Sequence, residues 1–270
     1  MRLGVGSYTF TWAVGVPGHE PDAPLTATDL LLKAKKLTVG VVQFADNLPL
    51  DALPPEELRE IVNRSQEMGI AIEVGTRGIQ PDHLRSYLHV AQRAQSQIVR
   101  VVIDTAHHQP DENEAVDLIR KVMPDYERAG VCLAIENHDR FQAKTLARIV
   151  ERVSSSSAGV CLDTVNSFGA LEGPEVVVDT LAPLVTNLHI KDFAIRRANH
   201  QMGFAIEGTP AGKGRLDIPW LLDIVRNNGR DANAILELWT PPEDELDATI
   251  AKEDAWARSS VDYLRTLIPD

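Results

Sequence analysis

Eight short apolar segments alternate with longer amphipathic segments along this chain of 270 residues. The apolar segments are rich in Val, Ile, Leu and Ala, a composition typical of buried parallel strands. The segments between them place apolar residues at helical spacing, as Leu58, Ile61 and Val62 do. We expect strands at residues 3–8, 41–44, 71–74, 99–103, 131–135, 160–162, 187–190 and 234–238.

This regular alternation predicts the α/β fold class, in the form of a single (β/α)8 TIM barrel. Pro54 and Pro55 suit the start of a helix, whereas Gly69 and Gly130 suit helix ends. An amphipathic segment over residues 251–267 should close the ring of helices. Because nothing in the composition marks a second unit, we expect one catalytic domain over residues 1–270.

Four of the expected strands end beside a side chain that can bind a metal ion: Glu136, Asp163, His189 and Glu237. Parallel strands deliver their last residues to one rim of a barrel, and these four strands would be neighbours in the ring. Singly, each residue could be a helix cap, a core histidine or an ion-pair partner. Together, three carboxylates and one imidazole indicate a divalent cation, with Mn²⁺ as our first choice and Mg²⁺, Co²⁺ or Zn²⁺ as alternatives.

Several motifs at the expected strand ends resemble those of one known family over nearly the whole chain. They are Ser7-Tyr8-Thr9-Phe10, Leu133-Ala134-Ile135-Glu136-Asn137-His138, Cys161-Leu162-Asp163-Thr164, His189-Ile190-Lys191-Asp192, Gly212-Lys213-Gly214-Arg215-Leu216-Asp217 and Leu236-Glu237. The chain resembles the sugar phosphate isomerase/epimerase family with the xylose isomerase-like barrel, which also contains ketose 3-epimerases and endonuclease IV.

The resemblance implies that Glu136, Asp163, His189 and Glu237 are metal ligands, and that Glu136 and Glu237 also exchange protons with the substrate. Ketose 3-epimerases commonly carry a histidine at the position of Asn166 and a glutamate where this chain has Gln142. We therefore expect substrate contacts that differ from theirs.

The leading functional hypothesis is a divalent-metal-dependent isomerase or epimerase that acts on a ketose or keto-sugar derivative through an enediolate. A Lewis acid beside the carbonyl oxygen would stabilise the charge that forms when the neighbouring C–H bond ionises. The alternative is a metal-dependent lyase, a decarboxylase or dehydratase, acting on a keto sugar acid. An endonuclease IV-like phosphodiesterase or a noncatalytic sugar-binding barrel is the weakest hypothesis.

The expected substrate contacts come from the loops that follow several strands. Tyr8, Phe10 and Trp12 could form an apolar wall against a sugar, or simply plug the barrel mouth. Glu73, His107 and Asn166 could bind hydroxyl groups, although ordinary loop and capping roles compete with this interpretation. Residues 193–215 are expected to form a glycine-rich lid loop in which Arg196 and Arg197 clamp a carboxylate or phosphate, with plain solvated charges as the alternative.

The formal net charge of −12 disfavours attraction to phosphate backbones, so we expect a small sugar or sugar-acid substrate and no nucleic acid. No apolar stretch has membrane-spanning length and residues 1–10 lack an export-signal pattern, so we expect no membrane contact and a cytoplasmic location. Cys132 and Cys161 lie in expected strands and should be buried, reduced thiols. The sequence leaves a homo-oligomer open.

Overall fold

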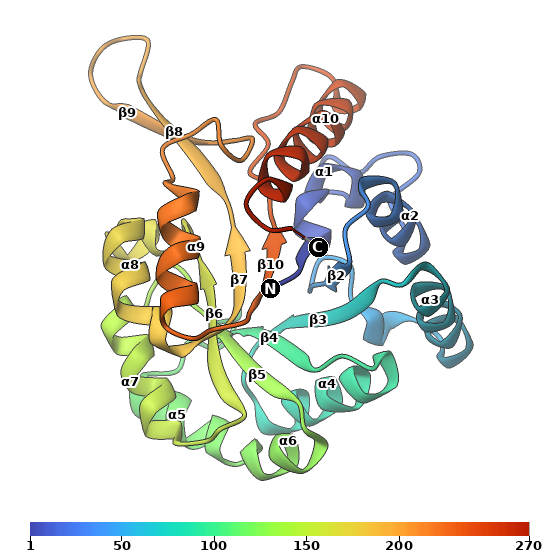
Figure 1. Cartoon of the computed structure of the whole chain (residues 1–270), viewed down its shortest axis with the longest axis vertical. Coiled ribbons are helices and arrows are strands. Elements are labelled where there is room, and N and C mark those ends of the chain that lie inside the picture. The colour runs from blue at the N-terminus through green and yellow to red at the C-terminus, as the bar shows by residue number, and fades with distance from the viewer. Residues whose placement is uncertain (270) are drawn as a thin grey trace.

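Eight parallel strands close into a barrel in the order β1-β10-β7-β6-β5-β4-β3-β2, in a computed structural model that describes residues 1–269 (Figure 1). The first strand pairs with both of its neighbours in the ring, through Leu3 to Ala234 and through Gly4 to Val41. The predicted (β/α)8 fold is therefore confirmed. The strands are β1 (Leu3–Gly6), β2 (Val41–Phe44), β3 (Ala71–Arg77), β4 (Ile98–Val102), β5 (Cys132–Glu136), β6 (Ala158–Asp163), β7 (Val185–Ile190) and β10 (Asn233–Leu236).

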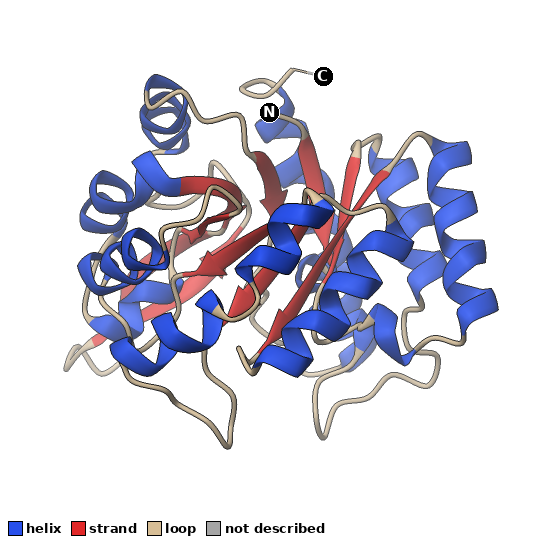
Figure 2. Ribbon diagram, turned by 90° about the horizontal axis from the view of Figure 1, so that it is seen from below, coloured by secondary structure: helices blue, strands red, loops and turns tan. Residues whose placement is uncertain are grey.

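Helices surround the barrel on its outside, as Figures 1 and 2 show. Pro55 is the first residue of α3, and Gly69 and Gly130 end α3 and α6 with left-handed backbone, as their sequence positions predict. The helices are α1 (Thr11–Val14), α2 (Ala27–Leu37), α3 (Pro55–Met68), α4 (Pro81–Ala94), α5 (Glu112–Arg120), α6 (Met123–Ala129), α7 (Ala143–Val153), α8 (Pro174–Leu181), α9 (Ile218–Asn227) and α10 (Leu246–Arg265). No helix within residues 1–269 has both the length and the apolar character that crossing a bilayer requires.

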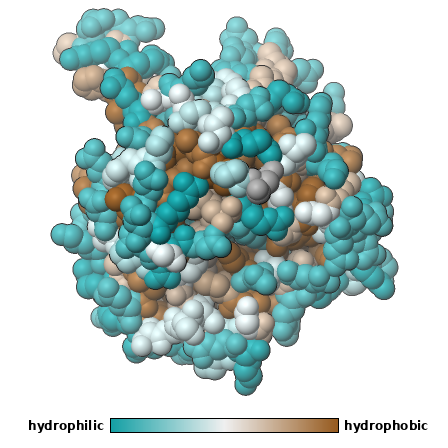
Figure 3. Space-filling view, in the orientation of Figure 1, coloured by the Kyte–Doolittle hydropathy of each residue, from teal (hydrophilic) through white to brown (hydrophobic). Residues whose placement is uncertain are grey.

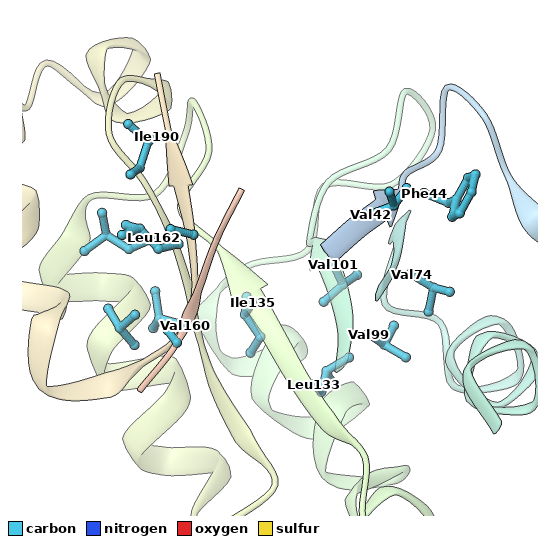
Figure 4. Packing of buried hydrophobic residues seen from close by; sticks show 14 of the residues in the cluster. Val42, Phe44, Val74, Val99, Val101, Leu133, Ile135, Val160, Leu162 and Ile190 are labelled. Carbon is cyan, nitrogen blue, oxygen red and sulfur yellow. The ribbon is translucent and has the colours of Figure 1, made fainter. Parts of the chain in front are cut away.

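Side chains alternate along each barrel strand between an apolar outer layer and a polar interior. Val99 and Val101 of β4 belong to the apolar core, part of which Figure 4 shows, while Arg100 between them is a buried charge. The same alternation on β5 separates Ile135 from Glu136. Because successive side chains point to opposite faces of a strand, the apolar residues pack under the helices and the polar ones face the barrel axis.

The expected lid loop is wrong in its secondary structure. Within residues 193–215 the chain forms most of an antiparallel hairpin of β8 (Asp192–Arg197) and β9 (Phe204–Thr209), which stands out from the barrel in Figure 1. The alternation of Phe193 with Ile195, and of Phe204 with Ile206, is a strand pattern that the glycines of this region obscure.

A buried carboxyl group joins α1 to the last helix. The carboxylate oxygens of Glu253 on α10 accept hydrogen bonds from the backbone N–H groups of Trp12 and Ala13, at 3.1 and 3.2 Å. The side chain has no exposed surface, and its burial raises the pKa of Glu253 from 4.5 to about 7. The contact between α1 and α10 therefore depends on whether the Glu253 carboxyl group is protonated.

We expect Glu253→Gln to remove a pH dependence of stability. Between pH 4.5 and about 7 the folded protein holds a carboxyl proton that the unfolded chain has released, so the free energy of unfolding should fall as pH rises through this window. Urea unfolding at pH 5 and pH 8 should show the variant gaining stability relative to wild type at the higher pH, by at most about 3 kcal/mol. Exposed Glu57→Gln is the control, and an equal difference at both pH values would contradict the linkage.

Candidate metal and substrate site

The four predicted ligand residues meet at the C-terminal rim of the barrel. His189 Nδ1 lies 3.4 Å from Glu136 Oε2, 3.8 Å from Asp163 Oδ2 and 3.2 Å from Glu237 Oε1. All four side chains are buried. Neighbouring strands β5, β6 and β7 end at or beside the first three residues, and Glu237 directly follows β10. Residues that lie far apart in the sequence therefore form one compact cluster.

The cluster has the donor set of a divalent cation site. One ligand-capable atom from each of Asp163, His189 and Glu237 lies within 4.8 Å of the other two, and Glu136 and Cys161 form a similar group with His189. Asp163 Oδ2, His189 Nδ1 and Glu237 Oε2 are buried and make no hydrogen bond of good geometry within residues 1–269. Burial raises the pKa of the Cys161 thiol, so the carboxylates and the imidazole are the better ligands.

A lysine side chain enters the same cluster. Lys191 Nζ lies 2.9 Å from Asp163 Oδ2 and 2.8 Å from Glu237 Oε2, both ion-pair distances. Burial opposes the charged form of Lys191, but the carboxylates of Asp163 and Glu237 outweigh it and raise the lysine pKa above its usual range. Lys191 is therefore a permanent cation at neutral pH. Lys191 lies two positions after His189, so strand alternation directs both side chains toward the barrel axis, although the pairing of β7 ends at Ile190.

Glu136 is also paired with a buried cation. Arg100 donates from Nε to Glu136 Oε2 and from Nη1 to Asp46 Oδ1 at 3.2 Å, while Asn166 donates to Glu136 Oε1 at 2.8 Å. Burial raises the pKa of Glu136, but the Arg100 charge outweighs this and holds it below its usual range. Sequence reasoning missed Arg100. The available signal was a single charge in the middle of the apolar strand Ile98–Val102.

The orientation of His189 is fixed by an amide in the barrel interior. His189 Nε2 lies 2.8 Å from Gln43 Oε1, and Gln43 Nε2 donates to Glu73 Oε2 and Asn187 Oδ1 at 3.1 and 3.0 Å. Because both partners of Gln43 Nε2 are acceptors, the amide oxygen must face the histidine, and His189 carries a proton on Nε2. His189 Nδ1 is thereby directed at the carboxylate cluster.

A cavity of about 640 Å³ lies above the cluster, next to Glu237 and Lys191. Its lining includes three predicted substrate contacts, Tyr8, Trp12 and Asn166. The basic residues that line it are Arg77, Arg100 and Lys191, together with His138. Glu207 and Glu237 line it as well, so charges of both signs face the cavity beside a wall of aromatic groups.

The other predicted substrate contacts lie outside the lining of this cavity. Phe10 is buried beneath Lys33, and Glu73 lies in the barrel interior, where it accepts hydrogen bonds from Gln43 and side-chain amides on β7 and β10. His107 lies in an exposed turn after β4. Two arginines lie on the exposed hairpin: Arg196 pairs with Glu207, and Arg197 stacks over Phe204 at 4.5 Å.

Fold and cluster together define a barrel enzyme architecture with a candidate divalent-cation site at the strand ends. The sequence profile of the xylose isomerase-like TIM barrel family matches residues 31–267, and the chain belongs to this family. It is 35% identical over 269 residues to the 3-oxo-isoapionate decarboxylase of Pectobacterium atrosepticum, covering 100% of this chain and 97% of that protein.

Solved structures share the fold at lower sequence identity. A D-psicose 3-epimerase determined in the presence of D-fructose superposes with a TM-score of 0.75 at 16% identity, over 100% of both chains. A xylose isomerase-like barrel protein from Mycobacterium smegmatis in complex with magnesium has a TM-score of 0.68 at 14% identity, over 97% of both chains. The decarboxylase and the epimerase among these relatives are both sugar-modifying enzymes.

We expect Gln43→Leu to weaken Mn²⁺ binding about 10- to 100-fold, because His189 loses the acceptor that fixes its tautomer. Titration of Mn²⁺ followed by electron paramagnetic resonance measures the free ion directly, and thermal unfolding checks that the variant is folded. Exposed Gln97→Leu provides the matched control. A folded Gln43→Leu protein that binds Mn²⁺ within twofold of wild type would refute this role for Gln43.

Proposed function

We propose that this protein decarboxylates a 3-oxo sugar acid and uses a divalent cation held by Glu136, Asp163, His189 and Glu237. The observation that carries the proposal is the pair of buried cations, Arg100 and Lys191, at the floor of the cavity. Together with a bound divalent cation they would outweigh the charges of the three buried carboxylates, which favours an anionic substrate. The relative that is 35% identical over 269 residues carries the name of a 3-oxo acid decarboxylase, which agrees with this charge pattern.

A 3-oxo acid has a ketone on the carbon next to the one that carries its carboxylate. When carbon dioxide leaves, the electron pair of the broken C–C bond moves toward the ketone oxygen and forms an enolate, which a proton then converts to the product ketone. A divalent cation bound at the carboxylate cluster would supply Lewis-acid stabilisation of that developing charge. The chain itself has to bind the acid, stabilise charge and deliver the proton.

Lys191 provides a fixed positive charge with three N–H donors beside the cavity. Because its pKa is raised, Lys191 stays protonated throughout the reaction and stabilises negative charge on oxygen. Arg77, which lines the cavity and pairs with Asp46 at 3.3 Å, supplies a partly exposed guanidinium for the carboxylate before it leaves.

The proton that replaces carbon dioxide reaches the enolate carbon through the carboxylate of Glu237. Glu237 faces the cavity, so it can take up a proton from solvent and pass it to the substrate, while Lys191, 2.8 Å away, keeps its own proton and positions the carboxylate. One C–C bond breaks, one C–H bond forms, and no oxidant or reductant is consumed. Tyr8, with a pKa raised by burial, stays a hydroxyl donor on the same wall.

A ketose epimerase or isomerase is the second candidate function. It is favoured by the positions of Glu136 and Glu237, which both lie close to His189 Nδ1 and could exchange protons with a carbon placed between them. The ion pair of Glu136 with Arg100 weighs against it, because a carboxylate with a lowered pKa is a weak base.

The two functions predict different products. Protein loaded with Mn²⁺ or Mg²⁺ should release carbon dioxide from 3-oxo-isoapionate in D₂O and place one deuterium on the product carbon. The same protein should leave D-fructose and D-psicose without deuterium exchange, as followed by proton NMR. Epimerisation of a ketose without gas release from the 3-oxo acid would reject the decarboxylase in favour of the second candidate.

We expect Lys191→Met to lower kcat/KM for decarboxylation by about 100- to 1,000-fold, the usual effect of removing a donor that stabilises an oxyanion. Methionine is unbranched and only one atom shorter than lysine, and it removes the charge together with its N–H donors. Mn²⁺ affinity should be unchanged or higher, since the ammonium no longer pairs with Asp163 and Glu237. Exposed Lys213→Met is the matched control. Retention of full activity by folded Lys191→Met would show that the lysine has no part in the reaction.

A further inference from the structure

The hairpin of β8 and β9 carries an unusual share of exposed apolar surface. Seven large hydrophobic side chains within residues 1–269 are exposed, and four of them lie in this hairpin: Ile195 at 41%, Met202 at 84%, Phe204 at 64% and Ile206 at 46%. Single exposed apolar residues are ordinary, but a cluster of this kind marks an interaction surface. Figure 3 shows the hairpin as a projection at the upper left, where apolar and polar residues are mixed.

The strand register places most of this apolar surface on one face. Ile195 is opposite Ile206, and Arg197 is opposite Phe204, two positions farther along each strand. Residues two apart on a strand point to the same side, so these four side chains share a face. The Arg197 guanidinium lies 4.5 Å from the centre of the Phe204 ring, which leaves a basic group at the outer end of this face.

The same face continues at its base into a groove between α8 and α9. Phe193, two positions before Ile195 on β8, lines this groove of about 530 Å³ together with Val176 and Trp220. Three acidic residues line the groove as well: Glu175, Asp179 and Asp217. Arg215 is the one basic residue of the lining. A basic apolar projection therefore stands beside an acidic apolar groove.

We propose that the hairpin and this groove form a two-fold interface between two copies of the chain, with the hairpin of each copy seated in the groove of the other. In a two-fold contact one surface meets its own copy, so a surface with a basic part and an acidic part complements itself. Arg197 of each hairpin would face the acidic groove of the partner copy. Ile195 and Phe204 would be buried, away from water, against the apolar wall of that groove.

The interface would also support the substrate cavity. Ile206, Glu207 and Gly208 of β9 line that cavity, so the strand that presents Phe204 to the partner copy also forms part of the cavity wall. Gly208 fits against Trp239 of the same wall, since a Cβ atom there would come within 2.4 Å of Trp239 Cβ. The proposal does not depend on which reaction the protein catalyses.

Sedimentation equilibrium of the full chain over a range of concentrations tests the proposal. Wild type should be a dimer at micromolar concentration, and Ile195→Asp/Phe204→Asp should raise the dissociation constant by at least about 100-fold. Leu32→Asp changes an exposed hydrophobic residue, 49% exposed on α2, and should leave the dimer intact. Thermal unfolding confirms that each variant is folded. A monomeric wild type, or a hairpin variant that remains dimeric, would overturn the proposal.

Charge reversal tests the hairpin and groove as partners without removing apolar surface. Arg197→Glu alone, and Glu175→Arg/Asp179→Arg alone, should each weaken the dimer about tenfold or more, and the three changes combined in one chain should recover part of this loss. Recovery requires the two regions to meet across the interface. If the combined variant is no tighter than either parent, the hairpin does not pair with the groove.

Discussion

Three carboxylates buried within one small cluster are stable only when their charges are compensated. Burial alone would raise the pKa values of Glu136 and Asp163, yet both are held below their usual range. Arg100 compensates Glu136, and Lys191 lies between Asp163 and Glu237. The site therefore contains fixed positive and negative charges before any ligand binds. A reaction with an anionic intermediate needs positive charges that are preorganised in this way.

The barrel makes this cluster rigid by separating its two kinds of side chain. The apolar residues of the strands face the helices, and the polar ones face the axis, where Gln43, Glu73 and Asn187 bond to one another. This interior network orients His189 from below, while Arg100 and Asn166 hold Glu136 from the side. His189 is thus held with Nδ1 directed at the centre of the cluster, and Glu136 is held in place by two donors.

The sequence was sufficient to predict the barrel and the four candidate ligands, because both depend on local patterns. Short apolar runs define the strands, and a parallel barrel gathers the residues at their ends. The partners of those ligands depend on tertiary geometry. Alternation turns Lys191 inward together with His189, but the carboxylates that its Nζ contacts come from other strands, at Asp163 and Glu237.

Which side chains reach the cavity also depends on tertiary structure. Glu73 is bound by amides on other strands inside the barrel, while Tyr8 and Trp12 reach the chamber from the segment after β1. The hairpin of β8 and β9 is hard to recognise in the sequence, because the alternating pattern of each strand is short and glycines lie close to it. The pairing of strands in three dimensions, rather than residue type, therefore determines which of these side chains reach the cavity.

The choice between proton transfer and decarboxylation turns on how the two glutamates are held. An epimerase needs a base on each side of the reacting carbon, so each carboxylate has to be able to take up a proton. Arg100 and Asn166 occupy both oxygens of Glu136, which makes that carboxylate a fixed anion and a poor base. The proposed decarboxylation needs only one proton delivered to one face, and Glu237 beside the cavity suffices for it. The buried arginine of β4 is thus the feature that most clearly supports the proposed loss of carbon dioxide over proton exchange.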